Sequence, residues 1–280
     1  HAYETRAFLE MRELHDGAGL WRRLAERLGE RGVPSLEEEL RYQQLGPVHD
    51  AVRAAIIDWS RDGEPGMDAA ARVVNTVAEA TGTAGDRDAV VDRILGYYAA
   101  ALQVADEIGD QSETAALLVW SLLAPLGTLP DGAMVGPTSR AWYEELRLAS
   151  VVADALRSRG LDEGVAWWAA ERVHTLLDLP LPSMLGGPAR TQPLRLVDAW
   201  LSHPAGRPFI RVNAWDGAEW FHRESWDELL AWVERLEWIL SPEDARPTRP
   251  VERSALEKAL KNANGAAALD EVASKKLLKA

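Results

Sequence analysis

Three tryptophans in the last third of the chain stand near acidic residues in a way that suits carbohydrate recognition. The chain has 12 Trp against 5 Tyr and 3 Phe, and six of these Trp lie between Trp200 and Trp238. Sugars present CH-rich faces that stack on indole rings, and carboxylates accept hydrogen bonds from sugar hydroxyls. The candidate ligand-binding or interface residues are Trp215, Asp216, Glu219, Trp220 and Trp238. The alternative is a tryptophan-rich minicore with no ligand.

The residue types present in the chain, and their spacing, disfavour most catalytic mechanisms. Cys is 0, which excludes thiol catalysis and cysteine-ligated metals. No lysine precedes Lys258, so a P-loop is not expected, and no Gly-x-Ser-x-Gly elbow occurs. The histidines are scattered, with no two at metal-ligand helical spacing. We therefore expect no cofactor and no metal, assign no catalytic residue, and lean against an enzyme for this chain alone.

One acidic set has the spacing of a magnesium clamp. Asp106, Glu107 and Asp110 resemble the Asp-rich motif of isoprenoid synthases, because acids at i and i+4 share a helix face. Gly109 weakens the helix at that point, and no second acidic set follows in later helices. We interpret the three acids as a solvated helix end.

Charge and hydropathy restrict the partners. The net charge of -13 disfavours nucleic acid, since backbone phosphates require a concentrated basic face. No apolar run approaches the roughly 20 residues of a membrane helix. These features predict a cytoplasmic protein with neither a nucleic-acid partner nor a membrane partner.

The hydrophobic pattern predicts a mainly α fold, a multi-helix bundle. Apolar residues recur at spacings of three and four, which is typical of amphipathic helices. Helices are expected at 49–59, 68–80, 87–108, 112–125, 139–159, 162–178 and 194–201, with linkers at 127–137 and 179–193. Trp59, Trp120, Trp142 and Trp200 lie in apolar stripes and are assigned to the core.

One short antiparallel hairpin is expected near 207–222. Residues 209–212 are predicted to form a strand, Asp216-Gly217 a two-residue turn, and residues 218–221 the return strand. The helix at 225–240 should begin with a capping box of Ser225 and Glu228. Its apolar stripe leaves Trp238 on the opposite side.

The predicted linkers divide the chain into three segments. These are a helical domain at 1–178, a helix–hairpin–helix region at 194–240, and a tail at 251–280. All five lysines lie between Lys258 and Lys279, and a proline-containing linker precedes them. We expect the tail to be weakly coupled to the fold.

Residues 209–232, which read FIRVNAWDGAEWFHRESWDELLAW, resemble a helical region outside the catalytic barrel of certain large bacterial α-amylase-family proteins. The shared pattern is an aromatic-aliphatic-x-Val-Asn run, then Gly, then Trp-Phe, then Glu and a Leu-rich helix. Ala218 stands where that pattern has Val. The acid-bearing barrel motifs of α-amylases are absent, so the resemblance transfers no catalytic residue.

Two functional hypotheses result. The resemblance implies a non-catalytic accessory module whose partner is a glycoside hydrolase domain or an α-glucan. The alternative is a protein-interaction or homo-oligomerisation module unrelated to carbohydrate. A self-contained all-α enzyme is the third and weakest reading.

Overall fold

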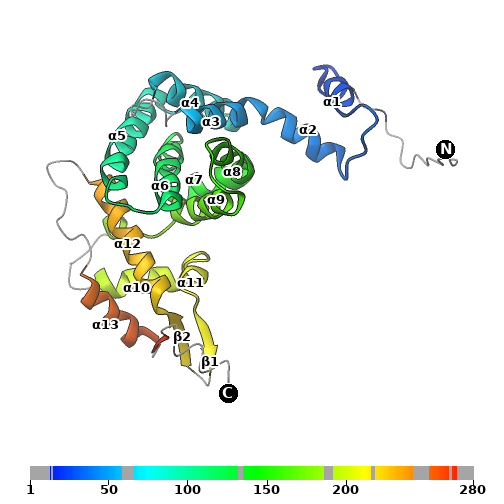
Figure 1. Cartoon of the computed structure of the whole chain (residues 1–280). Coiled ribbons are helices and arrows are strands. Elements are labelled where there is room, and N and C mark those ends of the chain that lie inside the picture. Colours follow the sequence, from blue (N-terminus) through cyan, green and yellow to red (C-terminus); the bar gives the residue numbers. More distant parts are fainter. Residues whose placement is uncertain are drawn as a thin grey trace. The chain divides into compact units, whose positions relative to one another are not determined.

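The computed structural model describes residues 13, 15–58, 66–131, 135–185, 192–215, 218–241, 252–264 and 267–269. The chain divides into two compact units, His1–Pro47 and Val48–Ala280. The described part is mainly α-helical with one small sheet, as the periodicity predicts (Figure 1). Trp59 lies outside the described residues.

The first unit contains two short helices, α1 (Leu20–Leu28) and α2 (Leu36–Gln44). Leu24 and Leu28 of α1 are buried. The N-cap of α2 is Ser35, whose hydroxyl accepts a hydrogen bond from the Glu38 amide at 3.1 Å. The ion pair between Arg27 and Glu39 connects the two helices at 2.6 Å.

The second unit opens with a bundle of helices. Their bounds are α3 (Gly46–Asp58), α4 (Met67–Thr81), α5 (Arg87–Ala105), α6 (Gln111–Leu123), α7 (Val135–Glu145), α8 (Leu148–Ser158) and α9 (Glu163–Leu177). Helix α6 is at the centre: it packs against α5 on one side and α9 on the other, and nine consecutive residues from Ala115 to Leu123 are buried. Trp120 on α6 and Trp142 on α7 are buried as predicted.

The predicted single helix at 139–159 is two helices. Arg147 has φ 54, a left-handed conformation that ends α7 and begins α8. The predicted linker at 127–137 is also wrong in part, because η1 (Ala124–Thr128) is a buried 3₁₀ turn. Gly127 is required there, since a Cβ would lie 2.1 Å from the Val135 carbonyl oxygen.

The remaining elements surround a second apolar cluster. They are η2 (Pro182–Met184), α10 (Gln192–Ser202), α11 (Gly206–Phe209), β1 (Asn213–Trp215), β2 (Ala218–His222), α12 (Arg223–Leu240), α13 (Arg253–Asn264) and β3 (Ala267–Leu269). Trp200, Trp226 and Phe221 form the cluster, with ring centroids 5.6 Å and 5.9 Å from that of Trp226. Helix α12 also packs against α5.

The hairpin is present, but its first strand is displaced. Residues 213–215 pair antiparallel with 218–220, and Trp215 is the partner of Ala218, so two residues connect the strands. Asp216 and Gly217, the predicted turn, lie outside the described residues. The predicted strand at 209–212 is wrong: Phe209 ends a helical turn, and Arg211 has φ 52, which is incompatible with an extended strand.

The predicted capping box at Ser225 and Glu228 is also wrong. Helix α12 begins two residues earlier, and its N-cap is His222, whose Nδ1 lies 3.4 Å from the Ser225 amide and 3.1 Å from the Ser225 hydroxyl. The Glu228 carboxylate instead forms an ion pair with Arg172 at 2.7 Å. Tertiary charge pairing therefore overrides the local motif.

The C-terminal helix is packed rather than separate. Helix α13 lies alongside α10, with Leu256, Ala259 and Leu260 buried (Figure 1). Strand β3 extends the sheet by pairing parallel with β2. The predicted tail thus packs on the fold over 253–260, while its weak coupling and the division into 1–178, 194–240 and 251–280 stay predictions.

Candidate functional site: an aromatic pocket around Arg172

Helix α9 carries most of the site. Its N-cap is Asp162, whose carboxylate accepts a hydrogen bond from the Gly164 amide at 2.9 Å. One face is fully apolar and packs against α6 and α8, with buried residues Ala166, Ala169, Ala170 and Val173. The other side of the helix turns Trp168, Glu171, Arg172 and Thr175 toward α11 and α12.

The one-turn helix α11 brings Phe209 to this side of α9. The turn fits against the end of α10 only because residue 206 is glycine, since a Cβ there would lie 2.1 Å from the Trp200 carbonyl oxygen. The amide of Ile210 donates to the Gly206 carbonyl at 3.2 Å, which closes the turn. Ile210 itself is fully buried and anchors the segment.

Arg172 connects the three elements. Its guanidinium carbon lies 4.0 Å from the ring centroid of Phe209 and 4.9 Å from that of Trp168. A guanidinium nitrogen lies 2.7 Å from the Glu228 carboxylate on α12. Burial lowers the pKa of Arg172 and the charge of Glu228 opposes that shift, so the side chain stays a cation.

An open pocket of about 250 Å³ lies over this contact. Its apolar surface comes from aromatic and proline side chains and its polar surface from one carboxylate, one guanidinium and one hydroxyl. The lining residues are Trp168, Glu171, Arg172, Thr175, Ala205, Pro208 and Phe209. Such a mixture suits a ligand that has both an apolar face and hydrogen-bonding groups.

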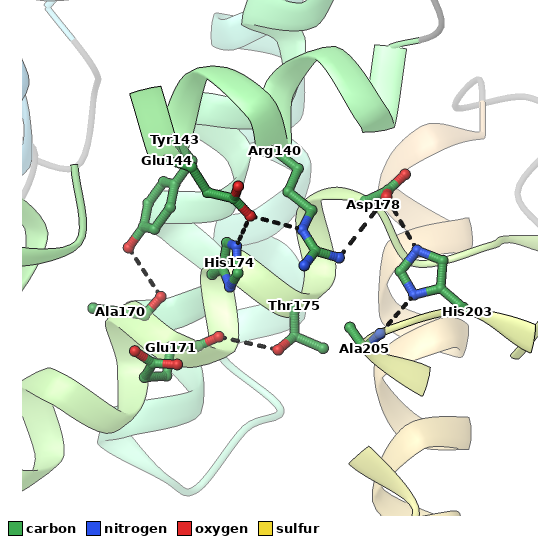
Figure 2. A network of polar contacts seen from close by, with 10 residues as sticks. All are labelled: Arg140, Tyr143, Glu144, Ala170, Glu171, His174, Thr175, Asp178, His203 and Ala205. Carbon is green, nitrogen blue, oxygen red and sulfur yellow. Dashed lines mark hydrogen bonds and ion pairs between the residues drawn. The ribbon is translucent and has the colours of Figure 1, made fainter. Parts of the chain in front are cut away.

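A chain of charged groups connects α7, α9 and the segment before α11 (Figure 2). Arg140 on α7 donates to Glu144 at 3.1 Å and lies 3.9 Å from Asp178, and each of these carboxylates binds a histidine. His174 donates to Glu144 at 2.6 Å, and His203 donates to Asp178 at 3.0 Å. The hydrogen bonds from His174 and Arg140 lower the pKa of Glu144.

His203 has a structural role in this chain of contacts. Nδ1 of His203 accepts the Ala205 amide hydrogen at 3.2 Å, so the imidazole carries its proton on Nε2 and both nitrogens are engaged. Ala205 also lines the pocket. The Asp178–His203 contact therefore fixes the end of α9 to the segment that carries α11.

Tyr143 on α7 contacts α9 through both its hydroxyl and its ring. Its hydroxyl donates to the Ala170 carbonyl at 2.9 Å, and its ring stacks on His174 with centroids 5.6 Å apart. Burial raises the pKa of Tyr143, and the nearby charge of Glu171 adds to this, so the phenol stays neutral. A neutral hydrogen-bond donor suits this position, since the bond to the carbonyl requires the proton.

The residues predicted from the sequence do not form one site. Trp215 and Glu219 lie on β1 and β2, and Glu219 is the register partner of Ala214. Trp220 is half-buried on β2, opposite Asn213. Trp238 is half-buried on α12, fifteen residues beyond the start of the helix at Arg223, or about 22 Å along its axis. The hairpin residues are thus close in the chain, and Trp238 is remote from them.

Sequence reasoning missed the pocket because its residues were assigned elsewhere. Phe209 was expected in a strand, and Glu228 in a cap. The available signal was the tandem pair Trp167-Trp168, whose side chains point about 100° apart on a helix and could not share one core. In the structure Trp168 lines the pocket, and Trp167 is 40% exposed.

The described residues contain neither a candidate metal site nor a helix that could span a membrane. Among the residues that the structure describes, no group of three or more His, Cys, Asp or Glu could hold a metal ion. None of the described helices is long and apolar enough to cross a bilayer. In comparisons with known proteins, no family model, no curated protein and no solved structure matches the chain.

Proposed function

We propose that this chain is a non-catalytic helical accessory module of an α-glucan-processing, α-amylase-family-like protein, and that the Arg172 pocket contacts the glucan. The observation that carries the proposal is the lining of the pocket. Trp168 and Phe209 supply aromatic surface for the CH-rich face of a sugar ring, while Glu171 and Thr175 supply hydrogen-bonding groups.

The charges around the pocket favour a neutral ligand. Arg172 is paired with Glu228, so it presents no uncompensated cation to a phosphate or carboxylate. Sugars are neutral and exchange hydrogen bonds with paired charged groups without demanding a net charge. This argument supports a glucan over an anionic metabolite.

The same lining supports a binding role over hydrolysis. Glycosidases use two carboxylates that flank the scissile bond. Glu171 is the one carboxylate among the described residues that line the pocket. Turnover of maltooligosaccharides by the purified protein would contradict this part of the proposal.

Calorimetric titration with maltooligosaccharides tests the binding. Truncating an aromatic anchor typically costs roughly 2 kcal/mol, so Trp168→Ala should weaken binding about thirtyfold. Thr175→Val keeps the shape but removes the hydroxyl, and should weaken binding about three- to tenfold. Thermal melting of each variant is needed, because Trp168 also stacks on Arg172.

Trp167→Ala is the matched control for this experiment. It removes the neighbouring indole, which does not line the pocket, and should change maltooligosaccharide affinity less than about twofold. Absence of binding by the unaltered protein, or equal losses in Trp167→Ala and Trp168→Ala, would contradict the assignment. In that case the interaction or oligomerisation module unrelated to carbohydrate becomes the better hypothesis.

A further inference from the structure

One exposed row of side chains on α9 forms a ridge that shares only Glu171 with the pocket. Glu163, Trp167 and Glu171 follow one another at four-residue spacing, and all three are exposed. Residues at i and i+4 lie one above the other, so the three side chains form one row about 12 Å long. Trp167 is 40% exposed, an unusual position for so large an apolar ring.

Elsewhere the protein holds arginines with the same pair of groups. Arg172 stacks on Trp168 and Phe209 and pairs with Glu228 at 2.7 Å. Arg235 lies 5.0 Å from the ring centroid of Trp232 and pairs with Glu113 at 2.9 Å. In both places an aromatic face and a carboxylate together bind one guanidinium.

The ridge repeats this arrangement without the arginine. Trp167 has a carboxylate on either side along the helix, and none of the described cations forms an ion pair with Glu163 or Glu171. We infer that the row Glu163–Trp167–Glu171 is a docking surface for an arginine-bearing segment of a partner protein. This inference does not depend on glucan binding.

The negative charge of the protein and the planar shape of the guanidinium both favour an arginine as the bound group. The net charge of -13 attracts a basic segment from a distance and accelerates association. A guanidinium is planar, so it stacks on an indole while its edge pairs with a carboxylate, whereas a lysine ammonium is a strongly hydrated point charge. The ridge therefore binds arginine in preference to lysine.

Fluorescence anisotropy with a labelled peptide of alternating glycine and arginine, beside its lysine equivalent, tests the inference at an ionic strength of about 0.1 M, where distant charges are screened. The arginine peptide should bind more tightly. Trp167→Ala should weaken its binding about two- to fivefold, the size of an exposed cation–π contact. Glu163→Gln combined with Glu171→Gln should weaken it about threefold or more.

A charge-matched control separates the ridge from general attraction. Glu79→Gln with Asp92→Asn removes two exposed acids from α4 and α5, the same change in net charge. This control should lose less than about 1.5-fold because those charges are screened from the ridge by salt. Equal losses in the control, equal affinity for the two peptides, or an unchanged Trp167→Ala would overturn the inference.

The two proposals fail separately. Glu171 belongs to both surfaces, whereas Trp168 belongs only to the pocket and Trp167 only to the ridge, so Trp168→Ala should leave arginine-peptide binding within about twofold. A variant that loses only maltooligosaccharide binding is therefore altered in the pocket. A variant that loses only peptide binding is altered in the ridge.

Discussion

Arg172 illustrates how one residue can decide the shape of a site. Its aliphatic stem crosses from α9 to α11, and its guanidinium meets Phe209 at 4.0 Å and Glu228 at 2.7 Å. Removing Glu228 would leave this largely buried cation without its ion pair, which is costly. The pocket above it exists because these three side chains hold one another in place.

Glu144 provides a prediction at the residue scale. Its pKa is lowered by hydrogen bonds from His174 and Arg140, so the carboxylate stabilises the fold above the ordinary value of 4.5 and loses that effect as the pH falls below it. The side chain is 55% exposed, so solvent limits the gain to about 0.5 kcal/mol. Glu144→Gln should therefore be less stable than the parent at pH 7, and the difference should vanish near pH 3.

Urea unfolding at the two pH values measures this difference. Glu145→Gln is the control, because Glu145 is exposed on the same helix and forms no ion pair with any described residue. A stability loss in Glu144→Gln that is the same at both pH values would show that the cause is not the charge of the carboxylate.

At the scale of elements, α12 is the helix that connects the two apolar clusters. Its first turn contacts β2 and carries Trp226, and its later turns pack against α5. Glu237 is buried near its end, where one oxygen accepts hydrogen bonds from the Ser183 amide at 2.9 Å and hydroxyl at 2.8 Å. The helix thus fixes η2 as well as the hairpin.

The packing of α13 makes a prediction at the same scale. Leu256 is 2% exposed and Leu260 is 1% exposed, although the segment was expected to be separable. Leu260→Ala should lower the free energy of unfolding by about 2–5 kcal/mol, the cost of truncating a buried leucine. Chemical denaturation measures it, and Lys258→Ala on the exposed side of the same helix should change stability by less than about 0.5 kcal/mol.

Truncation of the chain at Pro250 should likewise lower the free energy of unfolding. Removing α13 uncovers the apolar side of α10 and breaks the bidentate contact of Arg253 with Glu234, at 3.0 Å and 2.7 Å. A melting temperature within a few degrees of the parent would support the original expectation of an independent tail.

At the scale of the whole molecule, distance separates the residues once grouped as one surface. Trp220 lies on β2, while Trp238 lies about 22 Å beyond the start of α12 along the helix axis. The effects of Trp220→Ala and Trp238→Ala on unfolding should therefore add within about 0.5 kcal/mol. A coupling energy well above that value in the double variant would show that the two residues share one cluster after all.

The spacing of apolar residues predicts the class of the fold and most of its helices. Helix formation depends on a local pattern, so the apolar spacing predicted residues 162–178 where the structure has Glu163–Leu177, and 68–80 where it has Met67–Thr81. The burial of Trp120, Trp142 and Trp200 followed from the same pattern, because an indole in an apolar stripe faces the core.

The candidate site depends on contacts between residues far apart in the chain. The run at 209–212 has high strand propensity, yet Phe209 ends a helical turn because Gly206 lets that turn approach Trp200 and because Arg172 stacks on its ring. Glu228 had a local partner in Ser225, but the guanidinium of Arg172, 56 residues earlier in the chain, binds it instead. The period of the apolar residues indicates which side of an element is apolar. Contacts between residues far apart in the chain depend on how the elements pack together, and no local pattern encodes this packing.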